Sequence, residues 1–421
     1  MDKKTELRTQ NLELSKESET ELRTQSSELR EKTEIKNQSS KLRKELTHIV
    51  LPPSMIGIIG GGQLGRMMAI SARQMGYRIA VLESGANSPA GPVADEVWNA
   101  EYDDRDALTA MLKMAGVVTY EFENVPYAPV RELAPLGNLP QGSLPLIITS
   151  HRLREKLAIE GAGYKVAPFL AVMSKDELRY AVSKVGYPCI LKTSTGGYDG
   201  KGQWILHSES DLPEVLEIAN DNVYVLEGFV NFTKEVSVIV TRGVNGDIQS
   251  FPVTENEHVN QILHVSIAPA RISDSLRAEA ESIAKGLIEN LDYIGTLAIE
   301  MFVTDDGLII NELAPRPHNS GHWTIDGCTV SQFEQHIRAI CGLPLVKPET
   351  NGYAVMVNLL GQHFDYALSA WQKPEFSDGK LHLYGKDEMK RDRKIGHINF
   401  VGNDWEELEA QVERFLAEFP E

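Results

Sequence analysis

Residues 187–203 read Tyr-Pro-Cys-Ile-Leu-Lys-Thr-Ser-Thr-Gly-Gly-Tyr-Asp-Gly-Lys-Gly-Gln, and this stretch decides the fold. Its first part predicts a strand that ends at Lys192, and its second part predicts a glycine-rich loop. Glycines let the backbone N–H groups of such a loop wrap a polyphosphate, and the lysine ammonium supplies a point charge for the phosphate oxygens. The spacing G-x-x-x-x-G-K-[ST] is missing, so the stretch predicts a nucleotide site that is not a P-loop.

Two strands with acidic residues follow this loop. Residues 223–228, Val-Tyr-Val-Leu-Glu-Gly, predict a strand that ends near Glu227, and Glu235 precedes a predicted strand at 236–240. A glycine-rich hairpin tip alone is common in proteins. A lysine before the loop and two glutamates after it are not part of that common pattern, and they favour a nucleotide site.

The next acidic pair lies in a predicted hairpin. Residues 299–303 (Ile-Glu-Met-Phe-Val) and 308–313 (Leu-Ile-Ile-Asn-Glu-Leu) are joined by a Gly/Asp turn, which predicts two buried antiparallel strands. Glu300 and Glu312 can then face each other, and two carboxylates in apolar surroundings repel unless a cation lies between them. Magnesium takes oxygen ligands and bridges to substrate phosphates. The following loop, 314–323, adds an arginine, two histidines and an asparagine, which is typical of a nucleotide and oxyanion site.

The chain before residue 120 alternates strands and helices, a pattern typical of a parallel sheet. The predicted elements are strands at 56–59, 78–82 and 117–119 and a helix at 64–75. Residues 60–65, Gly-Gly-Gly-Gln-Leu-Gly, match G-x-G-x-x-G, and Glu83 ends the next strand. Taken alone, this dinucleotide fingerprint favours a nicotinamide-dependent oxidoreductase. The free N–H groups at a helix N-terminus suit any phosphate, however, so the motif is less specific than it looks.

Composition excludes several classes of protein. The 421 residues allow two or three domains, and no apolar run is long enough to cross a bilayer. A net charge of −18 argues against nonspecific binding to nucleic acid or to an anionic membrane. The three cysteines have no metal-site spacing and cannot form a disulfide framework, which implies a reducing cytoplasm.

The first 54 residues differ from the rest of the chain. Up to His48 they include no aromatic residue and almost no apolar residue except leucine, so they bury too little surface to offset the entropy of ordering. They also lack the apolar region of a signal peptide. We expect residues 1–54 to form a disordered, low-complexity extension, with Met55 as a possible alternative start.

The order of these motifs resembles the ATP-grasp superfamily, in which two α+β subdomains clamp ATP. Five stretches are together similar to the family of 5-(carboxyamino)imidazole ribonucleotide synthases, the ATP-grasp carboxylases of purine biosynthesis. They are residues 60–67, 120–126, 195–203, 255–258 and 311–323. The resemblance runs from Met55 to about Phe400. One departure is the run Lys-Arg-Asp-Arg-Lys at 390–394, where the family has Arg-Pro-Gly-Arg-Lys, but Lys386 and Arg393 keep the family spacing.

The resemblance and the element pattern predict a fold with α/β and α+β parts. We expect an N-terminal Rossmann-like parallel-sheet domain (55–149), a central ATP-grasp domain (150–348) and a small β-rich C-terminal domain (349–421). The last would contain strands at 353–360, 380–384 and 396–401 and a helix at 405–419. The resemblance also suggests a homodimer.

The resemblance implies where ATP and its metal bind. Lys192 and Arg152 would contact the phosphates, the loop would close over them, and the adenine would lie against the linker 227–230. The implied ATP site is Arg152, Lys192, Gly197, Tyr198, Asp199, Gly200, Lys201, Gly202, Gln203, Glu227, Gly228, Phe229, Val230, Glu235, His258, Asn311 and Glu312. Glu300 and Glu312 would hold Mg²⁺ or Mn²⁺. Ala314 stands where related enzymes often have an asparagine ligand, so Asn311 or Asn319 would take its place.

The resemblance also implies a site for a ribonucleotide and bicarbonate. The implied ribonucleotide site is Gly61, Gly62, Gln63, Leu64, Glu123, Tyr198, Asp199, Lys201, Arg316, Asn319, Lys386 and Arg393. The implied catalytic residues are Arg316, Asp199, Lys201 and His258. The guanidinium of Arg316 suits planar bicarbonate. Asp199 is a candidate acceptor for the amine proton, and its alternative role as a turn residue beside Gly200 stays open.

Three hypotheses for the function follow. In the first, ATP phosphorylates bicarbonate to carboxyphosphate, which releases carbon dioxide to the amine of 5-aminoimidazole ribonucleotide and so forms 5-carboxyaminoimidazole ribonucleotide. The second is another ATP-grasp carboxylate–amine ligase, such as a formate-dependent glycinamide ribonucleotide transformylase. The third is the nicotinamide oxidoreductase. Bicarbonate-dependent phosphate release separates the first from the second, and an unchanged nicotinamide absorbance removes the third.

Overall fold

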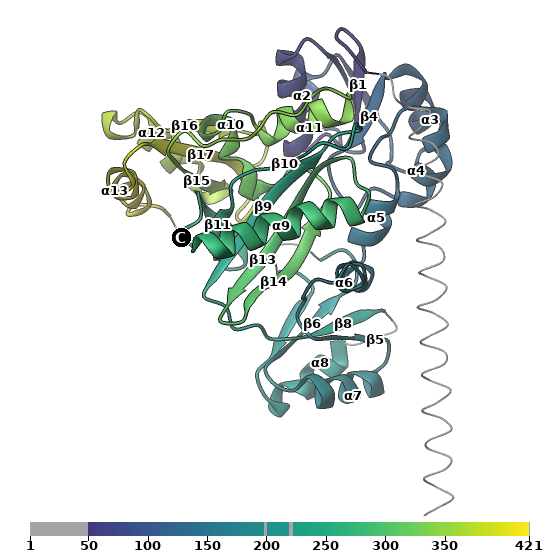
Figure 1. Cartoon of the computed structure of the whole chain (residues 1–421), viewed down its shortest axis with the longest axis vertical. Helices are drawn as coiled ribbons and strands as arrows, with labels where there is room; N and C mark the ends of the chain where they lie inside the picture. The colour runs from purple at the N-terminus through teal and green to yellow at the C-terminus, as the bar shows by residue number, and fades with distance from the viewer. Residues whose placement is uncertain (1–48, 198–199, 219–221, 421) are drawn as a thin grey trace, which may run out of the picture. The chain divides into compact units, whose positions relative to one another are not determined.

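The computed structural model of the chain describes residues 49–197, 200–218 and 222–420. The strands of this part form three sheets, which Figure 1 shows with their helices. Tyr198 and Asp199, two predicted site residues, lie outside the described residues, and so do residues 1–48 of the predicted extension.

The first sheet is parallel and has the strand order β3-β2-β1-β4. Its strands are apolar because helices cover both faces: α2 and α11 pack on one face, and α3 and α4 on the other. This is the predicted Rossmann-like sheet. Its elements and the helices that follow are β1 (Met55–Ile59), α2 (Gln63–Gln74), β2 (Arg78–Glu83), β3 (Glu96–Asn99), α3 (Arg105–Met114), β4 (Val117–Tyr120), α4 (Tyr127–Leu133), α5 (Leu144–Thr149) and α6 (Arg152–Gly161).

The second sheet is antiparallel, with the order β5-β8-β6-β7. The glycine-rich loop connects the neighbouring strands β6 and β7, and Gly196, Gly200 and Gly202 in it have φ of +74°, +76° and +74°. This left-handed region is open to glycine without strain, which explains the composition of the loop. The elements are β5 (Phe169–Val172), α7 (Lys175–Val185), β6 (Cys189–Thr193), β7 (Gln203–Leu206), α8 (Leu212–Ile218) and β8 (Tyr224–Gly228).

The third sheet has nine strands, in the order β14-β13-β9-β11-β12-β15-β17-β16, with β10 paired to β9. Strands β12 and β15 pair antiparallel, so this sheet continues across residue 348, where the sequence predicts a domain boundary. Its elements are β9 (Lys234–Arg242), β10 (Ile248–Ser250), β11 (Thr254–Val259), β12 (Ile262–Ala268), α9 (Asp274–Asn290), β13 (Gly295–Thr304), β14 (Gly307–Ala314), α10 (Thr324–Gly327), α11 (Gln332–Ile340), β15 (Tyr353–Leu360), α12 (Phe364–Trp371), β16 (Lys380–Leu383), β17 (Lys394–Gly402) and α13 (Trp405–Leu416).

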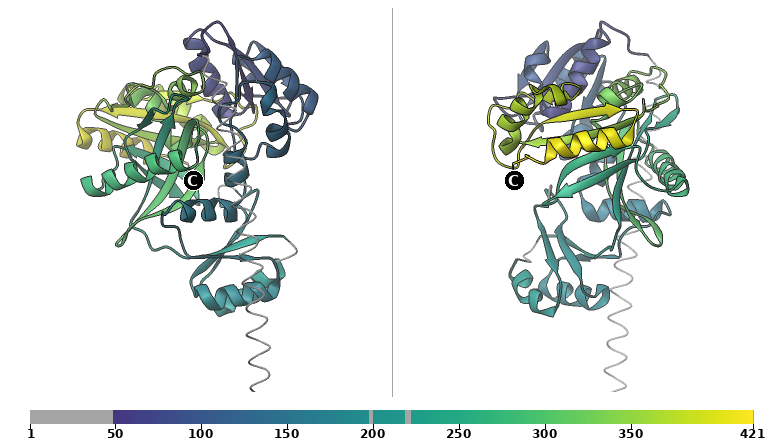
Figure 2. Two further views of the ribbon diagram at one scale, coloured as in Figure 1. Left: turned by 45° about the vertical axis from the view of Figure 1, so that its right-hand side comes forward. Right: turned by 90° about the vertical axis from the view of Figure 1, so that its left-hand side faces the viewer.

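The far end of this sheet has its own apolar core. Helix α13 lies along β17 and β15, as the right-hand view of Figure 2 shows, and it contributes Leu408, Val412 and Phe415 to a cluster with those strands. Three or four residues separate these side chains, which is the spacing of one helix face. The predicted C-terminal strands and helix are therefore confirmed, and the predicted fold class with them.

Residues 49–54 belong to the folded part, which corrects the predicted end of the extension at residue 54. Val50 is buried in the core between α2 and α11, and its backbone N–H donates to the carbonyl of Cys341 at 2.9 Å. The hydroxyl of Tyr77 donates to the carbonyl of Val50 at 2.7 Å. The low-complexity composition stops at His48, and two hydrogen bonds and an apolar side chain then order the next residues.

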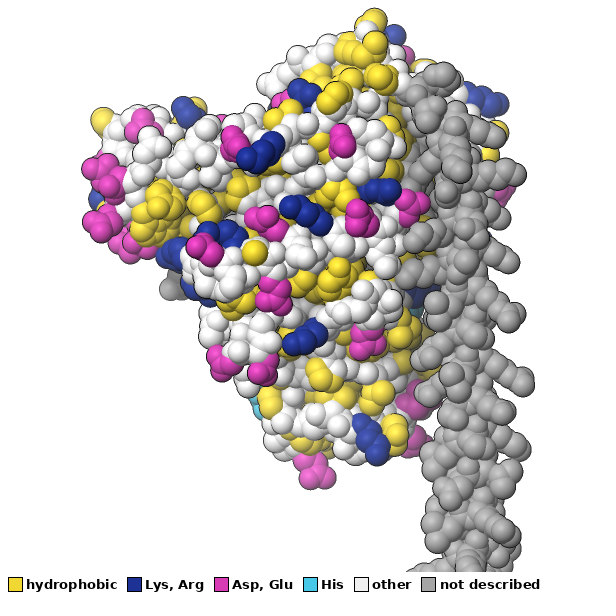
Figure 3. All heavy atoms as spheres, viewed as in Figure 1, with side chains coloured by type: hydrophobic (Ala, Val, Ile, Leu, Met, Phe, Trp, Pro, Cys, Tyr) yellow, Lys and Arg dark blue, Asp and Glu magenta, His cyan; other side chains and the backbone are white. Residues whose placement is uncertain are grey.

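The surface of the described residues carries both signs of charge. On the face drawn in Figure 3, Lys and Arg side chains alternate with Asp and Glu, and no broad basic area is visible on its described part. Such a face offers a polyanion little net attraction. Among the described helices, none is both long and apolar enough to cross a membrane.

Candidate active site

A cavity of about 610 Å³ lies where residues of the second and third sheets meet the segments after β4 and at the start of α6. It brings together side chains that are far apart in the sequence. The predicted site residues that line it are Glu123, Arg152, Lys192, Gly197, Gly200, Gln203, Glu235, His258, Glu300, Asn311, Glu312, Arg316 and Asn319. A site of this size is large enough for a nucleotide.

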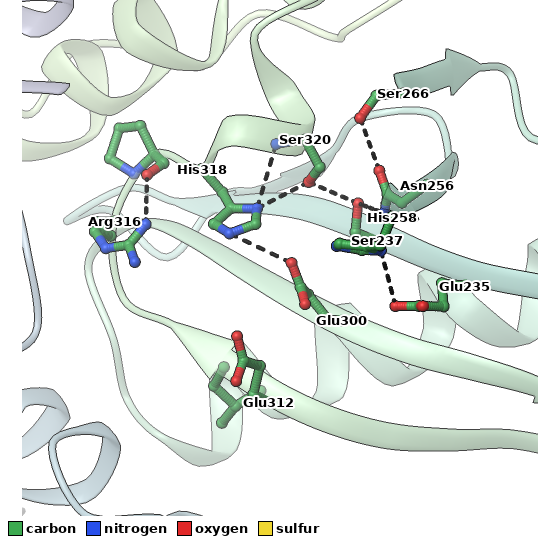
Figure 4. A network of polar contacts seen from close by, with 12 residues as sticks. Glu235, Ser237, Asn256, His258, Ser266, Glu300, Glu312, Arg316, His318 and Ser320 are labelled. Carbon is green, nitrogen blue, oxygen red and sulfur yellow. Dashed lines mark hydrogen bonds and ion pairs between the residues drawn. The ribbon is translucent and has the colours of Figure 1, made fainter. Parts of the chain in front are cut away.

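The two predicted metal-binding acids face each other in this cavity. Glu300 on β13 and Glu312 on β14 are direct partners in the antiparallel ladder, and the register shifts by a bulge immediately after Glu300. Burial, and then the charge of Glu312, raises the pKa of Glu300 to about 7. Figure 4 shows both carboxylates pointing into the same space. Repelling acids at this spacing are stabilised by a cation that both can bind.

Basic groups pair with these acids and with their neighbours. Arg152 Nη1 lies 3.5 Å from Glu312 Oε2, and Arg316 Nε donates to Glu123 Oε2 at 2.6 Å. Arg316, which is expected to bind bicarbonate, therefore contacts Glu123, which is expected to bind the ribonucleotide. Burial alone would raise the pKa of Glu123, but the charge and hydrogen bond of Arg316, with smaller contributions from a backbone hydrogen bond and from Arg152, together hold it below its usual value. The site thus contains two arginines that suit an anionic ligand.

Lys192 shares a buried carboxylate with a second lysine. Its Nζ and that of Lys156 each lie 3.0 Å from Glu227 Oε2. Burial alone would raise the pKa of Glu227, but the two ammonium charges outweigh it and lower the pKa. The ionised carboxylate neutralises one of the two lysine charges, and the surplus positive charge suits a polyphosphate.

Two histidines pair with acids across the cavity. His258 Nδ1 lies 3.2 Å from Glu235 Oε2, and His318 Nε2 lies 3.3 Å from Glu300 Oε1. Burial would lower the pKa of His258, but the hydrogen bond and charge of Glu235 raise it. Burial, with the charge of Arg316 as the next cause, lowers the pKa of His318. His318 is therefore neutral at physiological pH, whereas the acid beside His258 favours the charged form of that ring.

Asn319 shows that the cavity is built for a polar ligand. The residue is 7% exposed, and neither its Oδ1 nor its Nδ2 has a hydrogen-bond partner among the described residues. A buried amide without partners is costly unless a ligand or water satisfies it. This observation supports its predicted contact with substrate.

Several predicted residues do not line the cavity. The linker residues Glu227, Gly228, Phe229 and Val230, and Lys201 and Gly202 of the loop, are absent from its lining, as are Gly61, Gly62, Gln63, Leu64, Lys386 and Arg393. Two residues of the predicted ribonucleotide site nevertheless contact each other, because Lys386 Nζ donates to Gln63 Oε1 at 2.9 Å. Arg393 Nη1 donates to the carbonyl of Glu388 at 3.4 Å.

The glycine loop at 60–65 holds carboxylates of its own chain. Gly61 N–H donates to Glu83 Oε2 at 2.6 Å, Gly62 N–H to Glu121 Oε1 at 2.8 Å, and Gly65 N–H to Glu121 Oε2. The backbone donors that would bind a pyrophosphate in the dinucleotide interpretation are thus already used. This geometry speaks against a nicotinamide cofactor at the loop.

The charged cavity residues Glu155 and Lys394 were not predicted, and neither was Lys156, which contacts Glu227 outside the cavity lining. Arg152 and Lys156 are four residues apart on α6, so they share one helix face, and this spacing could have identified Lys156. Glu155 accepts from the backbone of Leu313 at 2.7 Å, a contact between distant segments that leaves no sequence signal. Lys394 directly follows the predicted Arg393.

Comparison with known proteins decides the family. Three family models match: a ribonucleotide synthetase preATP-grasp domain at residues 54–141, an ATP-grasp domain at 157–333, and a phosphoribosylaminoimidazole carboxylase C-terminal domain at 354–411. The N5-carboxyaminoimidazole ribonucleotide synthase of Bacillus subtilis is 48% identical over 355 residues, which cover 84% of this chain and 93% of that protein.

The chain belongs to the N5-carboxyaminoimidazole ribonucleotide synthase family.

Solved structures of N5-carboxyaminoimidazole ribonucleotide synthases share the fold. The Staphylococcus aureus enzyme in complex with ADP has a TM-score of 0.84 and 42% identity, covering 87% of this chain and 98% of its own. The Aspergillus clavatus enzyme in complex with ADP and 5-aminoimidazole ribonucleotide has a TM-score of 0.79 and 29% identity, covering 86% and 98%. As a member of this family the chain is an ATP-grasp ligase, which confirms the predicted resemblance and enzyme class.

Proposed function

We propose that the chain uses ATP to carboxylate 5-aminoimidazole ribonucleotide with bicarbonate, giving 5-carboxyaminoimidazole ribonucleotide, ADP and phosphate in purine biosynthesis. The observation that carries this proposal is the facing pair Glu300 and Glu312 in a cavity that also holds Lys192 and Arg316. The acids suit a phosphoryl transfer, and the arginine suits a small planar anion. The names of the relatives supply the identity of the nucleotide substrate and of ATP.

The two acids fit a hard divalent cation. Their oxygens are the ligands that Mg²⁺ and Mn²⁺ prefer, and burial, with the charge of Glu312 in addition, raises the pKa of Glu300. Among the described residues, no group of three His, Cys, Asp or Glu side chains could hold a metal alone. We infer that Glu300 and Glu312 would hold the cation beside the ATP phosphates. When bound, such a cation neutralises charge on the transferring phosphoryl group.

The remaining steps are assigned to side chains of the chain. Lys192 and Arg152 orient the ATP phosphates so that bicarbonate oxygen attacks the γ-phosphorus and ADP leaves. Arg316 holds bicarbonate and then carboxyphosphate. Because carboxyphosphate is labile in water, the loop at 197–203 would exclude solvent as it closes. Carboxyphosphate breaks to carbon dioxide and phosphate, the ribonucleotide amine attacks the carbon, and Asp199 accepts the amine proton.

The ribonucleotide is proposed to bind between the N-terminal glycine loop and the cavity. Asn319 offers an unsatisfied buried amide, and Lys386 contacts Gln63 at 2.9 Å. Lys386 Nζ also donates to the carbonyl of Lys394 at 2.5 Å, and Lys394 lines the cavity. A basic path thus leads from the glycine loop to the reaction centre. The substrate phosphate would lie at its outer end, beside Lys386 and Arg393.

Phosphate release with each substrate omitted in turn tests the reaction. We expect release to require ATP, bicarbonate and the ribonucleotide together. Release that depends on formate instead of bicarbonate would support a formate-dependent ligase, and oxidation of a reduced nicotinamide cofactor would support an oxidoreductase. Either result would contradict the proposal.

Two lysine variants test the assignment of the phosphates. Lys386→Ala should raise the KM for the ribonucleotide by about tenfold and leave the KM for ATP nearly unchanged, because a lost contact to a charged group costs about 1.5–3 kcal/mol. Lys192→Ala should show the reverse pattern. Steady-state kinetics with one substrate varied at a time measures both. If Lys386→Ala instead raises the KM for ATP, the assignment of the two phosphate-binding sites is wrong.

A homodimer in the cytoplasm remains an expectation from the family. Light scattering of the purified chain over a range of concentrations measures the assembly. A mass of one chain at all concentrations would contradict the dimer.

A further inference from the structure

A row of buried polar side chains leads from the middle of the large sheet to Glu300 (Figure 4). Its members come from three adjacent strands and from the loop after β14. They are Ser266 on β12, Asn256 on β11, Ser237 on β9, Ser320 in the 3₁₀ turn at Asn319–Gly321, and His318 before that turn. Ser237, Ser266 and Ser320 are fully buried, so water does not satisfy them.

Each member of this row is hydrogen-bonded to the next. Ser266 Oγ donates to Asn256 Oδ1 at 2.8 Å, and Asn256 Nδ2 donates to Ser237 Oγ at 2.9 Å. Ser237 Oγ donates to Ser320 Oγ at 2.8 Å, and Ser320 Oγ lies 2.9 Å from His318 Nδ1. At the other side of the ring, His318 Nε2 lies 3.3 Å from Glu300 Oε1.

The backbone fixes the direction of these hydrogen bonds at the histidine. The N–H of Ser320 points at His318 Nδ1 from 3.3 Å, and a backbone N–H can only donate. Nδ1 therefore carries no proton, and the single proton of the neutral ring lies on Nε2. The Ser320 hydroxyl then donates to Nδ1 as well, because it already accepts from Ser237. All donors along the row point the same way, toward the ring, and the ring in turn donates to the carboxylate.

We propose that His318 is a positioning residue that donates its Nε2–H to Glu300 and holds this carboxylate in the orientation that binds the divalent cation. The Ser–Asn row serves to keep the ring in the Nε2–H tautomer. Hydrogen-bond partners of metal-binding carboxylates generally orient these ligands, and the loss of such a partner weakens metal binding. The proposal rests on the proposed function only in taking Glu300 as a metal ligand.

The tautomer can be measured without substrates or metal. In metal-free protein labelled with ¹⁵N-histidine, two-bond ¹H–¹⁵N spectra distinguish the two neutral tautomers and the charged ring, and the signals missing in His318→Gln assign His318. We expect a ring protonated on Nε2 alone at pH 7.5. A proton on Nδ1, or a charged ring, would overturn the proposal. This result is independent of whether the chain carboxylates a ribonucleotide.

The effect on the cation is measured by Mn²⁺ binding, followed by electron paramagnetic resonance in the presence of ADP. His318→Leu removes the donor and should weaken Mn²⁺ binding about 10- to 100-fold. His318→Gln places an amide N–H near the position of Nε2 and should bind Mn²⁺ within a few-fold of the unchanged chain. His207→Leu, at an exposed histidine outside the site, is the matched control and should leave binding unchanged.

Two outcomes of the binding experiment would refute the assignment. If His318→Leu binds Mn²⁺ as tightly as the unchanged chain, the histidine does not position a ligand. If the Leu and Gln variants lose affinity equally, the ring contributes packing only. Should His318→Leu fail to fold, the tautomer measurement on the unchanged chain still decides.

Discussion

Glu300 and Glu312 face each other in the hairpin, but their surroundings differ. The side chain of Glu300 is 17% exposed and contacts His318, whereas that of Glu312 is 40% exposed and contacts Arg152. Burial, and then the charge of Glu312, raises the pKa of the Glu300 carboxyl group. Glu312 has a permanent cation beside it. Of the two acids proposed to hold a cation, Glu300 is therefore the more buried and Glu312 the more exposed.

Glu312→Gln should lower kcat about a hundredfold or more, because the charge stabilisation that a metal supplies is worth several kcal/mol. The fold should remain intact, since the side chain is partly exposed. Phosphate release over a Mg²⁺ titration measures the effect, with circular dichroism as the check on folding. Asp305→Asn, an exposed change in the turn of the same hairpin, is the control. Near-normal turnover in Glu312→Gln would remove this residue from the site.

Lys156 should matter to ATP binding although Lys192 is the residue that we propose contacts the phosphates. If Lys192 contacts the ATP phosphates as proposed, Lys156 still neutralises the charge of the buried Glu227. In Lys156→Met, Lys192 is the only ammonium partner of Glu227 left in the described structure. The KM for ATP should therefore rise about tenfold, and the free energy of unfolding should fall by about 3 kcal/mol. Lys156→Arg should recover most of both.

The control for Lys156 is Lys175→Met, which breaks an exposed ion pair with Glu217. Such pairs contribute about 1 kcal/mol or less. Urea denaturation and ATP kinetics on the three variants provide the comparison. Equal behaviour of the two methionine variants would show that Lys156 has no special role.

At the scale of elements, the turn between β1 and α2 is held by Glu121, the residue after β4. Burial, with the charge of Glu83 in addition, raises the pKa of Glu121 to about 7 despite two backbone hydrogen bonds. A side chain at Gly62 would place its Cβ 2.2 Å from Glu121 Oε1. Substitutions at this glycine would therefore displace an internal carboxylate, so they cannot report cleanly on phosphate binding.

The pKa of Glu121 predicts a dependence of stability on pH. In the unfolded chain a glutamate titrates near 4.3, so between about pH 4.5 and 7 the folded state binds more protons than the unfolded state. The free energy of unfolding should therefore fall as the pH rises through this window, and this contribution should level off above pH 7. Glu121→Gln should make the fall smaller. Urea denaturation at pH 5, 6 and 7 measures it.

Glu101→Gln, at an exposed position in the same domain, is the control for Glu121. It should leave the slope of stability against pH unchanged. If Glu121→Gln also leaves the slope unchanged, the carboxyl group titrates normally in the folded chain, and the turn is not held as described.

At the scale of the whole molecule, the N-terminal sheet and the large sheet share a core. Val50, Tyr77 and residues of α2 pack with α11, which belongs to the stretch between β14 and β15. A hydrogen bond from His336 Nε2 to Thr119 Oγ1, 2.8 Å long, also joins these parts, because the Thr119 hydroxyl donates to Gln141 Oε1 and the backbone N–H of Thr296 donates to His336 Nδ1. The parts therefore depend on one another for stability.

Truncation tests where the folded part begins. A chain that starts at Met55 should be less stable than one that starts at Ile49 by about 1.5–3 kcal/mol, because Val50 leaves the core. Thermal and urea denaturation of the two truncated chains measure the difference, and Val50→Ala in the longer one should reproduce part of it. Equal stability would mean that residues 49–54 contribute nothing to the fold.

The sequence alone determined the elements and the facing acids. Two apolar runs and the Gly/Asp turn between them located β13 and β14 within a few residues, and in an antiparallel ladder a turn of known length decides which residues pair. Glu300 and Glu312 could be matched for this reason. The lysine before the glycine loop was equally visible, because both parts of the motif are local.

Only the tertiary structure decided which distant groups form an ion pair or a hydrogen bond. Lys156 meets Glu227, and Glu121 fills the glycine loop, through contacts between residues more than fifty positions apart. The row of hydroxyls that ends at His318 crosses three strands, so no spacing in the sequence reveals it. The physical reason is that local patterns set the periodicity of each element, whereas the partners of a buried polar group depend on how the elements pack.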